Sequence, residues 1–371
     1  IQSLRRKNRT ACSGYGNRRA ACVCNHIKWR GAMKELVISS REAGLRLDRY
    51  LERYLCNAQK NFIYKMLRKK NITLNDTKCN GNEKLAGGDR IKIFFSDETL
   101  RKFTSAEKDT THRDVPDKIK LKVMYEDEDI VIIDKPSGML SQKASAGDKS
   151  LVEYVTEYLL DTGSLTQKDL ITFRPGICNR LDRNTSGLVV AGKTIKGLQE
   201  MSEAFRDRTL HKYYICVVAG RINERSRVSG YLVRDEKTNK STIYADYKEA
   251  LDNAEADMIN NIETEYIPAV SNDNFTLLKV KLITGRTHQI RAHLASLGHP
   301  IAGDVKYGSR QINKRMSDQY HIKSQMLHAY ELDYPQRGLC VRTDIPKEFD
   351  RVLKGEHIWE HGIQEDLEAL H

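Results

Sequence analysis

The sequence predicts an α+β fold, in which a small α+β domain precedes a larger domain built on a mixed, mainly antiparallel sheet. Residues 34–96 contain two short amphipathic helices and short apolar strands around turns. From residue 118 onward, segments with β-branched or alternating apolar residues predominate. Residues 97–117 between these parts are polar and charged without an apolar period, which is typical of a linker.

Residues 1–32 differ from the rest of the chain in composition. They contain no Asp or Glu and supply +8 of the formal net charge of +12, which leaves only +4 for residues 33–371. Basic charge is typical of proteins that bind nucleic acid, but most of it here is local. The segment also lacks the apolar stretch of a secretory signal. We expect a non-native or disordered basic extension, with translation starting at Met33; a targeting segment and a basic arm that binds nucleic acid are the alternatives.

Three of the eight cysteines lie in this first segment, where Cys12, Cys22 and Cys24 stand near His26. Such a group could hold zinc, but its spacing is not one that zinc sites use, and we expect no metal. The other five cysteines are scattered, which is typical of reduced thiols. No apolar run approaches the roughly 20 residues that span a bilayer. We therefore expect a cytoplasmic protein without a membrane segment.

Two helices are predicted within residues 34–96. Leu47, Leu51 and Leu55 recur at helical spacing and form the apolar face of the first. The second begins near Phe62 and ends in a basic cluster, which consists of Lys65, Arg68, Lys69 and Lys70. Cations are favourable at a helix C-terminus, so this cluster by itself fits an ordinary solvated helix end as well as a surface for phosphates.

Strands account for most of the remaining pattern. In the small domain they are expected around Ile72, Leu74 and the turn Gly87-Gly88-Asp89. In the larger domain, residues 118–350, strands are predicted at 121–125, 130–134, 187–191, 214–218 and 276–284, and a helix at 196–206. Residues 351–371 are charged, and we expect them to form a peripheral C-terminal tail.

One polar loop, residues 179–186, leads into an apolar strand and contains Asp182 between Arg180 and Arg183. Opposite charges nearby favour the ionised form of a carboxyl group. An ionised Asp is suited to act as a nucleophile, which must be deprotonated at neutral pH. A surface aspartate in a turn with flanking salt bridges explains the same residues.

A second segment joins a predicted strand that ends at Thr284 to a helix. Thr287 is a suitable N-cap, and Ile290 begins an apolar face at helical spacing. Arg291 then falls in the first turn, where a cation opposes the helix dipole by roughly 0.3–1 kcal/mol. This placement suggests a carboxylate or phosphate partner. Dipole reasoning also predicts that thermal stability changes little, or rises, when Arg291 is replaced by Gln.

A third segment, Lys212 to Val218, reads as a strand. Its two aromatic residues, Tyr213 and Tyr214, point to opposite faces because side chains alternate along a strand. One of them could pack in the core while the other meets a ligand. Aromatic residues in strands are usually core residues, so this segment alone does not decide between the two.

Taken in order, these segments resemble the RluA-type pseudouridine synthases, and residues 34–96 resemble the S4 RNA-binding domain that precedes the catalytic domain in bacterial members. The resemblance covers roughly residues 118–350 and departs from the family pattern at Asn179, where a His is usual. The motifs are Asp134-Lys-Pro-Ser-Gly-Met139, Arg180-Leu-Asp-Arg-x-Thr-Ser-Gly-Leu188, Lys212-x-Tyr214, Gly285-Arg-Thr-His-Gln-Ile-Arg-x-His-Leu294, Gly298-His-Pro-Ile-Ala-Gly-Asp304 and Leu327-His-Ala329.

The resemblance implies roles for individual residues. Asp182 matches the family's nucleophile, and Arg291 matches the arginine paired with it, which we expect to grip the carboxylate through two parallel hydrogen bonds. Tyr214 matches the tyrosine that stacks on the target base. Arg180 matches the arginine that fills the gap left by the flipped nucleotide. Further contacts with RNA are expected from Arg183, Lys212, Arg286 and His288, and in the small domain from Lys65, Arg68, Lys69 and Lys70.

The implied reaction is the isomerisation of specific uridines to pseudouridine in structured RNA, which needs no cofactor and no metal. Ribosomal RNA of the large subunit is the expected partner, and a monomer is the expected state. Two alternatives have other functions: a synthase that acts on transfer RNA, and a non-catalytic RNA-binding or ribosome-assembly factor that kept the fold.

Overall fold

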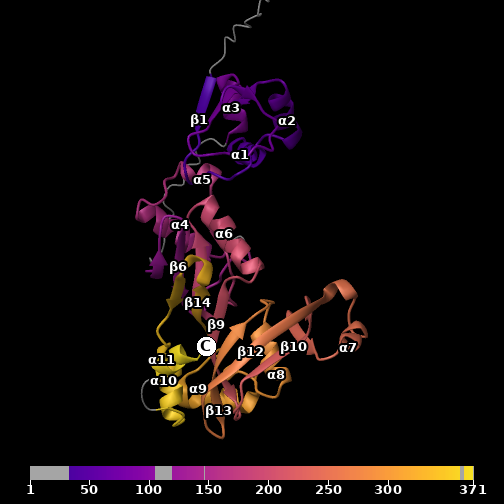
Figure 1. Ribbon diagram of the computed structural model, residues 1–371, viewed down its shortest axis with the longest axis vertical. Helices are drawn as coiled ribbons and strands as arrows, with labels where there is room; N and C mark the ends of the chain where they lie inside the picture. Colours follow the sequence, from indigo (N-terminus) through magenta and orange to yellow (C-terminus); the bar gives the residue numbers. More distant parts are fainter. Residues whose placement is uncertain (1–32, 105–118, 146, 360–362, 371) are drawn as a thin grey trace, which may run out of the picture.

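The structure, a computed structural model, describes residues 33–104, 119–145, 147–359 and 363–370. The basic extension, with its cysteine group, lies outside these ranges. The α+β prediction is confirmed: a small four-stranded sheet is followed by a larger, mainly antiparallel sheet (Figure 1). No helix in the described ranges is long and apolar enough to cross a bilayer.

The small unit contains an antiparallel sheet in the order β1-β4-β2-β3. The two predicted helices are present, and Leu47, Leu51 and Leu55 are fully buried in the hydrophobic core. Burial of this single apolar face explains why two short helices persist here. The bounds are β1 (Met33–Val37), α1 (Leu47–Tyr54), α2 (Lys60–Arg68), β2 (Ile72–Leu74), β3 (Thr77–Lys78) and β4 (Arg90–Phe94).

The segment expected to be a linker, residues 97–117, begins with a helix instead. This helix, α3 (Asp97–Phe103), starts at Ser96, whose side chain caps Thr99 N. Phe103 packs against Phe62 of α2 with ring centroids 4.5 Å apart. The helix was missed because its two apolar side chains, Leu100 and Phe103, are too few to form a periodic face. The remainder of the expected linker lies mostly outside the described residues.

Eleven strands form the large sheet, along the path β11-β10-β12-β13-β9-β14-β8-β6-β5, with β15 paired to β14 and β7 paired to β8. All pairs are antiparallel except β8 with β14. The bounds are β5 (Lys122–Glu126), β6 (Ile130–Lys135), β7 (Gly176–Ile177), β8 (Ser186–Gly192), β9 (His211–Ala219), β10 (Ser226–Asp235), β11 (Lys240–Tyr244), β12 (Ile259–Ser271), β13 (Phe275–Leu282), β14 (Leu327–Tyr334) and β15 (Leu339–Arg342).

The helices of the large domain lie on both sides of this sheet and at its ends (Figure 1). They are α4 (Leu151–Asp161), α5 (Asp169–Thr172), α6 (Ile195–Arg206), α7 (Tyr247–Leu251), α8 (Gln289–Ser296), α9 (Arg310–Tyr320), α10 (Lys347–Gly355) and α11 (Ile363–Ala369), with single 3-10 turns at Ala256–Met258 and Pro335–Arg337. Sequence periodicity had identified only α6 and α8 among them.

The small unit contacts the large domain through α5. Arg53 Nη1 donates to Thr172 O at 2.6 Å, and Arg41 lies 3.2 Å from Asp169. The Glu42 carboxylate also accepts a hydrogen bond from the Thr172 hydroxyl. Figure 1 shows α5 between the small unit and the rest of the molecule. These polar contacts orient the small unit relative to the large sheet.

The C-terminal residues do not form a peripheral tail, as had been expected for 351–371. Leu367 on α11 is fully buried, and its carbonyl accepts a hydrogen bond from Lys279 Nζ at 2.9 Å. Lys279 is buried in β13 and also lies 3.3 Å from Glu331. The prediction was wrong because it weighed the many charged residues and overlooked the few apolar ones that face the sheet.

A close approach of β8 to β14 shapes the centre of the sheet. Gly187 has a φ of +111°, and a Cβ at this position would lie 2.2 Å from Ala329 O, so only glycine fits. Next to it, Ser186 Oγ lies 2.7 Å from Nδ1 of the buried His328. The late Leu327-His-Ala329 motif therefore acts in packing, because it holds β14 beside the loop that precedes β8.

Candidate active site

A cleft of about 910 Å³ opens at the centre of the large sheet. It is lined by the loop before β8, by the start of β9, and by the loop that joins β13 to α8. The structure brings together in it eight residues that the sequence had singled out, which are Arg180, Asp182, Arg183, Lys212, Tyr214, Arg286, His288 and Arg291. These residues come from three segments more than 25 positions apart, so only the fold assembles them.

The loop that carries Asp182 is held by the loop after β6. Lys135, fully buried, donates to Met139 O at 3.0 Å and to Arg183 O at 3.1 Å. Ser141 Oγ donates to Leu181 O at 2.7 Å. Burial lowers the pKa of Lys135 to about 8, although the negative charge of Asp182 opposes the shift. Lys135 of the Asp134-Lys-Pro-Ser-Gly-Met139 motif thus fixes the backbone after Asp182, and Ser141, just beyond the motif, fixes the backbone before it.

Arg291 links two carboxylates. Its Nη1 donates to Asp182 Oδ2 at 2.7 Å, while Nε and Nη2 donate to the two oxygens of Asp304 at 2.7 and 2.9 Å. Asp304 is completely buried, and the Asp182 side chain keeps 25% exposure. Burial opposes ionisation of Asp304, but hydrogen bonds from Arg291 outweigh it and lower the pKa of Asp304. Arg291 is thus held from behind and presents one N–H to Asp182.

Two details of this pair differ from expectation. The fork of two parallel hydrogen bonds goes to Asp304 and not to Asp182, which receives a single bond. The N-cap of α8 is His288 and not Thr287, and His288 has a left-handed φ of +58°. The prediction placed Arg291 correctly in the first turn, but sequence spacing cannot show that a carboxylate 13 positions later reaches it.

His288 lies beside the same pair. Its Nε2 is 3.8 Å from Asp182 Oδ2, and its Nδ1 is 3.0 Å from the Tyr307 hydroxyl. Burial is the main cause that lowers the pKa of His288, so its ring is mostly neutral at neutral pH. The Tyr307 ring also faces the Arg291 guanidinium, 5.2 Å from its centroid. His288 and Tyr307 therefore close one side of the cleft around Asp182.

Tyr214 contributes an aromatic wall to the cleft. Its side chain is 7% exposed, and it lines the cleft together with Asp182. Burial, followed by the charge of Asp182, raises the pKa of the Tyr214 phenol, so it stays protonated. Tyr213 points to the opposite face, where Lys279 lies 4.8 Å from its ring centroid. The side chains of Tyr213 and Tyr214 therefore lie on opposite faces of β9, as predicted.

Arg180 and Arg183 flank Asp182 but do not pair with it among the described contacts. Arg183 Nε instead donates to Gly138 O at 3.0 Å, and Arg180 is exposed at the cleft. Adjacency in the sequence therefore does not identify which arginine pairs with Asp182. Side chains of adjacent residues in a turn diverge, and the ion pair comes from Arg291, 109 positions away.

Asn179, the departure from the family pattern, has a backbone role. Its Oδ1 accepts from Val190 N at 2.9 Å, and its Nδ2 donates to Leu188 O at 3.1 Å. The side chain thus ties the loop to the middle of β8. No hydrogen bond among the described residues joins the Asn179 side chain to Asp182.

Three residues important for the site were not singled out from the sequence. Asp304 and Lys135 occur in the family motifs, but neither residue gave a separate signal in the sequence. Gln289, fully packed, donates to Glu263 O at 3.1 Å and so locks the start of α8 to β12. Their roles depend on contacts between distant segments.

The basic cluster of the small unit lies outside this cleft. All four of its side chains are exposed, and no described carboxylate forms an ion pair with them; they are Lys65, Arg68, Lys69 and Lys70. Their exposure is consistent with a separate surface for phosphates, and equally with a solvated helix end.

Comparisons with known proteins identify the family to which the chain is similar. Residues 129–296 match the family model described as RNA pseudouridylate synthase. An uncharacterised RNA pseudouridine synthase of Mycoplasma genitalium is 30% identical over 307 residues, 81% of this chain and 89% of the relative. The ribosomal large subunit pseudouridine synthase D of Nitrosomonas europaea is 27% identical over 339 residues, 91% and 86% of the two chains. The human RNA pseudouridylate synthase domain containing 4 shares the fold, with a TM-score of 0.52 at 20% identity over 65% of this chain and 95% of that one.

Proposed function

Because this chain belongs to the RluA-type family of RNA pseudouridine synthases, which are isomerases, we propose that it modifies ribosomal RNA of the large subunit with Asp182 as the nucleophile. The single observation that carries the assignment of the site is that Arg291 forms ion pairs with both Asp304 and Asp182 at the cleft. It sets one partly exposed carboxylate, fixed in position, opposite the Tyr214 ring.

The reaction requires mainly that the protein hold a charged carboxylate in position beside the nucleotide. The bond between N1 of uracil and C1′ of the ribose breaks, and a bond between C5 and C1′ forms after the base turns. The proton on C5 leaves and N1 gains a proton, so the reaction needs no oxidant and no outside group. An ionised carboxylate held by Arg291 can attack an electrophilic carbon of the nucleotide, and it is free to leave again.

The target base has to leave the RNA stack before Asp182 can reach it, which costs a few kcal/mol. Tyr214 offers a flat, uncharged wall that is well suited to stack on the extruded base. Arg180 is exposed at the cleft near Asp182, and its side chain is placed to fill the space that the extruded base leaves in the RNA stack. Both roles are part of the proposal.

The ribosomal substrate is supported by the relative from Nitrosomonas europaea, whose name states that substrate and which covers 91% of this chain. The test is to map pseudouridines in all RNA of a strain that lacks the gene. At least one position in large-subunit RNA should return to uridine, and the wild-type gene, but not its Asp182→Asn variant, should restore it. Loss confined to transfer RNA would contradict the ribosomal substrate while keeping the enzyme assignment.

The basic cluster of the small unit should strengthen binding to RNA through its charge. Replacing Lys65, Arg68, Lys69 and Lys70 by Gln should weaken binding and flatten its salt dependence, because each lost phosphate contact reduces the slope of log K against log salt by about 0.9 for a duplex. Turnover at saturating RNA should change much less, since the cleft is unaltered. The matched control replaces four exposed cations of α9 and α10 that line neither hollow, which are Lys314, Lys347, Arg351 and Lys354. An unchanged slope would show that the cluster is only a solvated helix end.

A further inference from the structure

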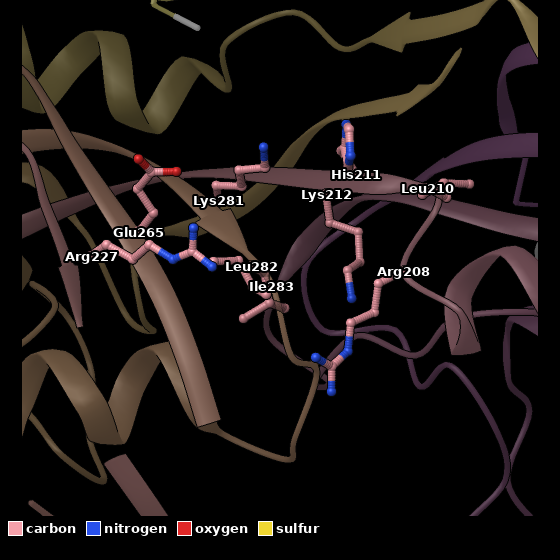
Figure 2. A pocket seen from close by; sticks show the side chains of 9 residues that line it. All are labelled: Arg208, Leu210, His211, Lys212, Arg227, Glu265, Lys281, Leu282 and Ile283. Atoms are coloured by element: carbon pink, nitrogen blue, oxygen red, sulfur yellow. The ribbon is translucent and has the colours of Figure 1, made fainter. Parts of the chain in front are cut away.

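A second hollow lies beside the cleft, where β9 and β13 cease to pair. It has a volume of about 180 Å³, and the register of the two strands ends at the pair Tyr213–Lys281. Figure 2 shows that Lys212 and Arg208 extend from their backbone to the same side, while Lys281 extends to the other. We call this hollow the basic notch; it is lined by Arg208, Lys212, Arg227, Lys281 and Leu282 among others.

Several charged side chains around the notch already have partners of opposite charge. Arg227 lies 2.6 Å from Glu263, and His211 lies 3.3 Å from Asp333. Lys212 and Arg208 differ from them, because none of the described carboxylates forms an ion pair with either. Lys212 and Arg208 therefore extend to one side of the notch without a carboxylate paired to either. Lys281, for which the described residues supply no ion pair either, extends to the other side, and Glu265, which also lines the notch, pairs with Arg225.

The backbone of Arg208 and the surroundings of the Lys212 ammonium are both constrained. Arg208 has a left-handed φ of +60° in the turn that follows α6, a conformation that non-glycine residues rarely adopt. Lys212 Nζ lies against Gly285, where an added Cβ would be 3.3 Å away. Burial, and then the charge of Arg208, lower the pKa of Lys212 to about 8. A bound anion would relieve this repulsion.

Lys212 also connects the notch with the cleft, since it lines both. It lies two residues before Tyr214 on β9, so the two side chains share one face of the strand. An RNA strand whose target base lies against Tyr214 brings its sugar-phosphate backbone past Lys212. We propose that the basic notch binds one phosphodiester group of the RNA, next to the target uridine, through Lys212 and Arg208. This inference rests on the proposed function of the cleft.

The two side chains suit one phosphodiester in complementary ways. A guanidinium offers N–H groups in a planar fork that matches two phosphate oxygens, while an ammonium acts as a compact charge with rotatable donors. The contact carries no information about base identity, because every nucleotide has the same phosphate. It would set how far the strand advances into the cleft, and so which nucleotide faces Asp182.

The test measures binding of the full chain to a fluorescent oligouridylate of about ten nucleotides over a range of salt concentrations. Lys212→Met and Arg208→Gln should each weaken binding about fivefold at low salt, and each should make the slope of log K against log salt shallower by about 0.7. Because both act on one phosphate, the double variant should lose less than the product of the two single effects.

Lys281→Met is the matched control, because it removes a charge of the same kind from the same hollow but on the other side of the strands. Equal effects of Lys281→Met would show that only total charge matters and would overturn the proposal. Unchanged affinity and slope in Lys212→Met and Arg208→Gln would also overturn it. Should Lys212→Met fail to fold in a thermal melt, Arg208→Gln, an exposed position, decides the question.

The outcome is separable from that of the substrate proposal. Weaker oligouridylate binding in the Lys212 and Arg208 variants, together with an unchanged set of pseudouridines in the ribosomal RNA of the deletion strain, would support the notch and reject the ribosomal substrate. Loss of a pseudouridine from the ribosomal RNA of the deletion strain, together with unchanged oligouridylate binding in these variants, would support the ribosomal substrate and reject the notch.

Discussion

Asp182→Asn should lower the rate of pseudouridine formation by at least about a thousandfold, equivalent to about 4 kcal/mol of barrier. The amide keeps the shape of the side chain but loses the charge that makes the carboxylate a nucleophile. The fold should survive, because Arg291 keeps its two hydrogen bonds to Asp304. Affinity for RNA should stay within a few-fold of wild type, since no phosphate-binding cation is altered.

Single-turnover assays of pseudouridine in the RNA substrate, with binding and thermal melts of the same protein, measure all three quantities. Asp273→Asn is the matched control, because that side chain is 91% exposed and remote from the cleft residues. Residual turnover within tenfold of wild type in Asp182→Asn would refute the assignment of the nucleophile. A large loss of stability would show that Asp182 acts mainly in folding.

Arg291→Lys is the second change with a large expected effect. Lysine keeps the charge but cannot bind both oxygens of Asp304 and one of Asp182 at the same time, since it lacks the planar fork. Turnover should fall at least about tenfold, or about 1.4 kcal/mol of barrier. Combination with Asp182→Asn should add little further loss, because both changes break the same unit.

Arg291→Gln separates the catalytic from the structural part of this role. Dipole reasoning predicted little change or a gain in stability, but the structure reverses that expectation. Asp304 has 0% side-chain exposure, and without Arg291 its buried charge would keep only the backbone N–H groups of Lys306 and Tyr307 and no cation, which costs roughly 3–5 kcal/mol. The melting temperature should therefore fall by several degrees or more.

The double variant Arg291→Gln with Asp304→Asn supplies the control, because it removes the buried charge together with its partner. It should regain much of the stability while remaining inactive. Full stability in Arg291→Gln alone would mean that Asp304 is neutral in the fold. Wild-type turnover in Arg291→Lys would show that the link to Asp182 does not matter for the reaction.

Local pattern and ordered motifs were enough to predict part of this protein. Leu47, Leu51 and Leu55 predicted α1 because a helix with one apolar face produces that spacing wherever it packs. Tyr213 and Tyr214 were assigned to opposite faces because alternation is a property of any strand. The family was recognisable because several motifs occur in one order, and the presence of Asp182, Tyr214 and Arg291 follows from those motifs.

Other features were decided only by tertiary contacts. The α11 helix was missed because it is stabilised by a contact with the buried Lys279 of β13. That residue is too distant in the sequence to enter a local pattern. The partner of Arg291 was assigned only in part, because Asp304 approaches it through a loop whose course depends on the whole sheet. That Lys212 and Arg208 line one hollow also follows only from the way β9 and β13 separate. Sequence determines which groups are available and which face of an element they occupy, whereas distances between charges depend on how those elements pack together.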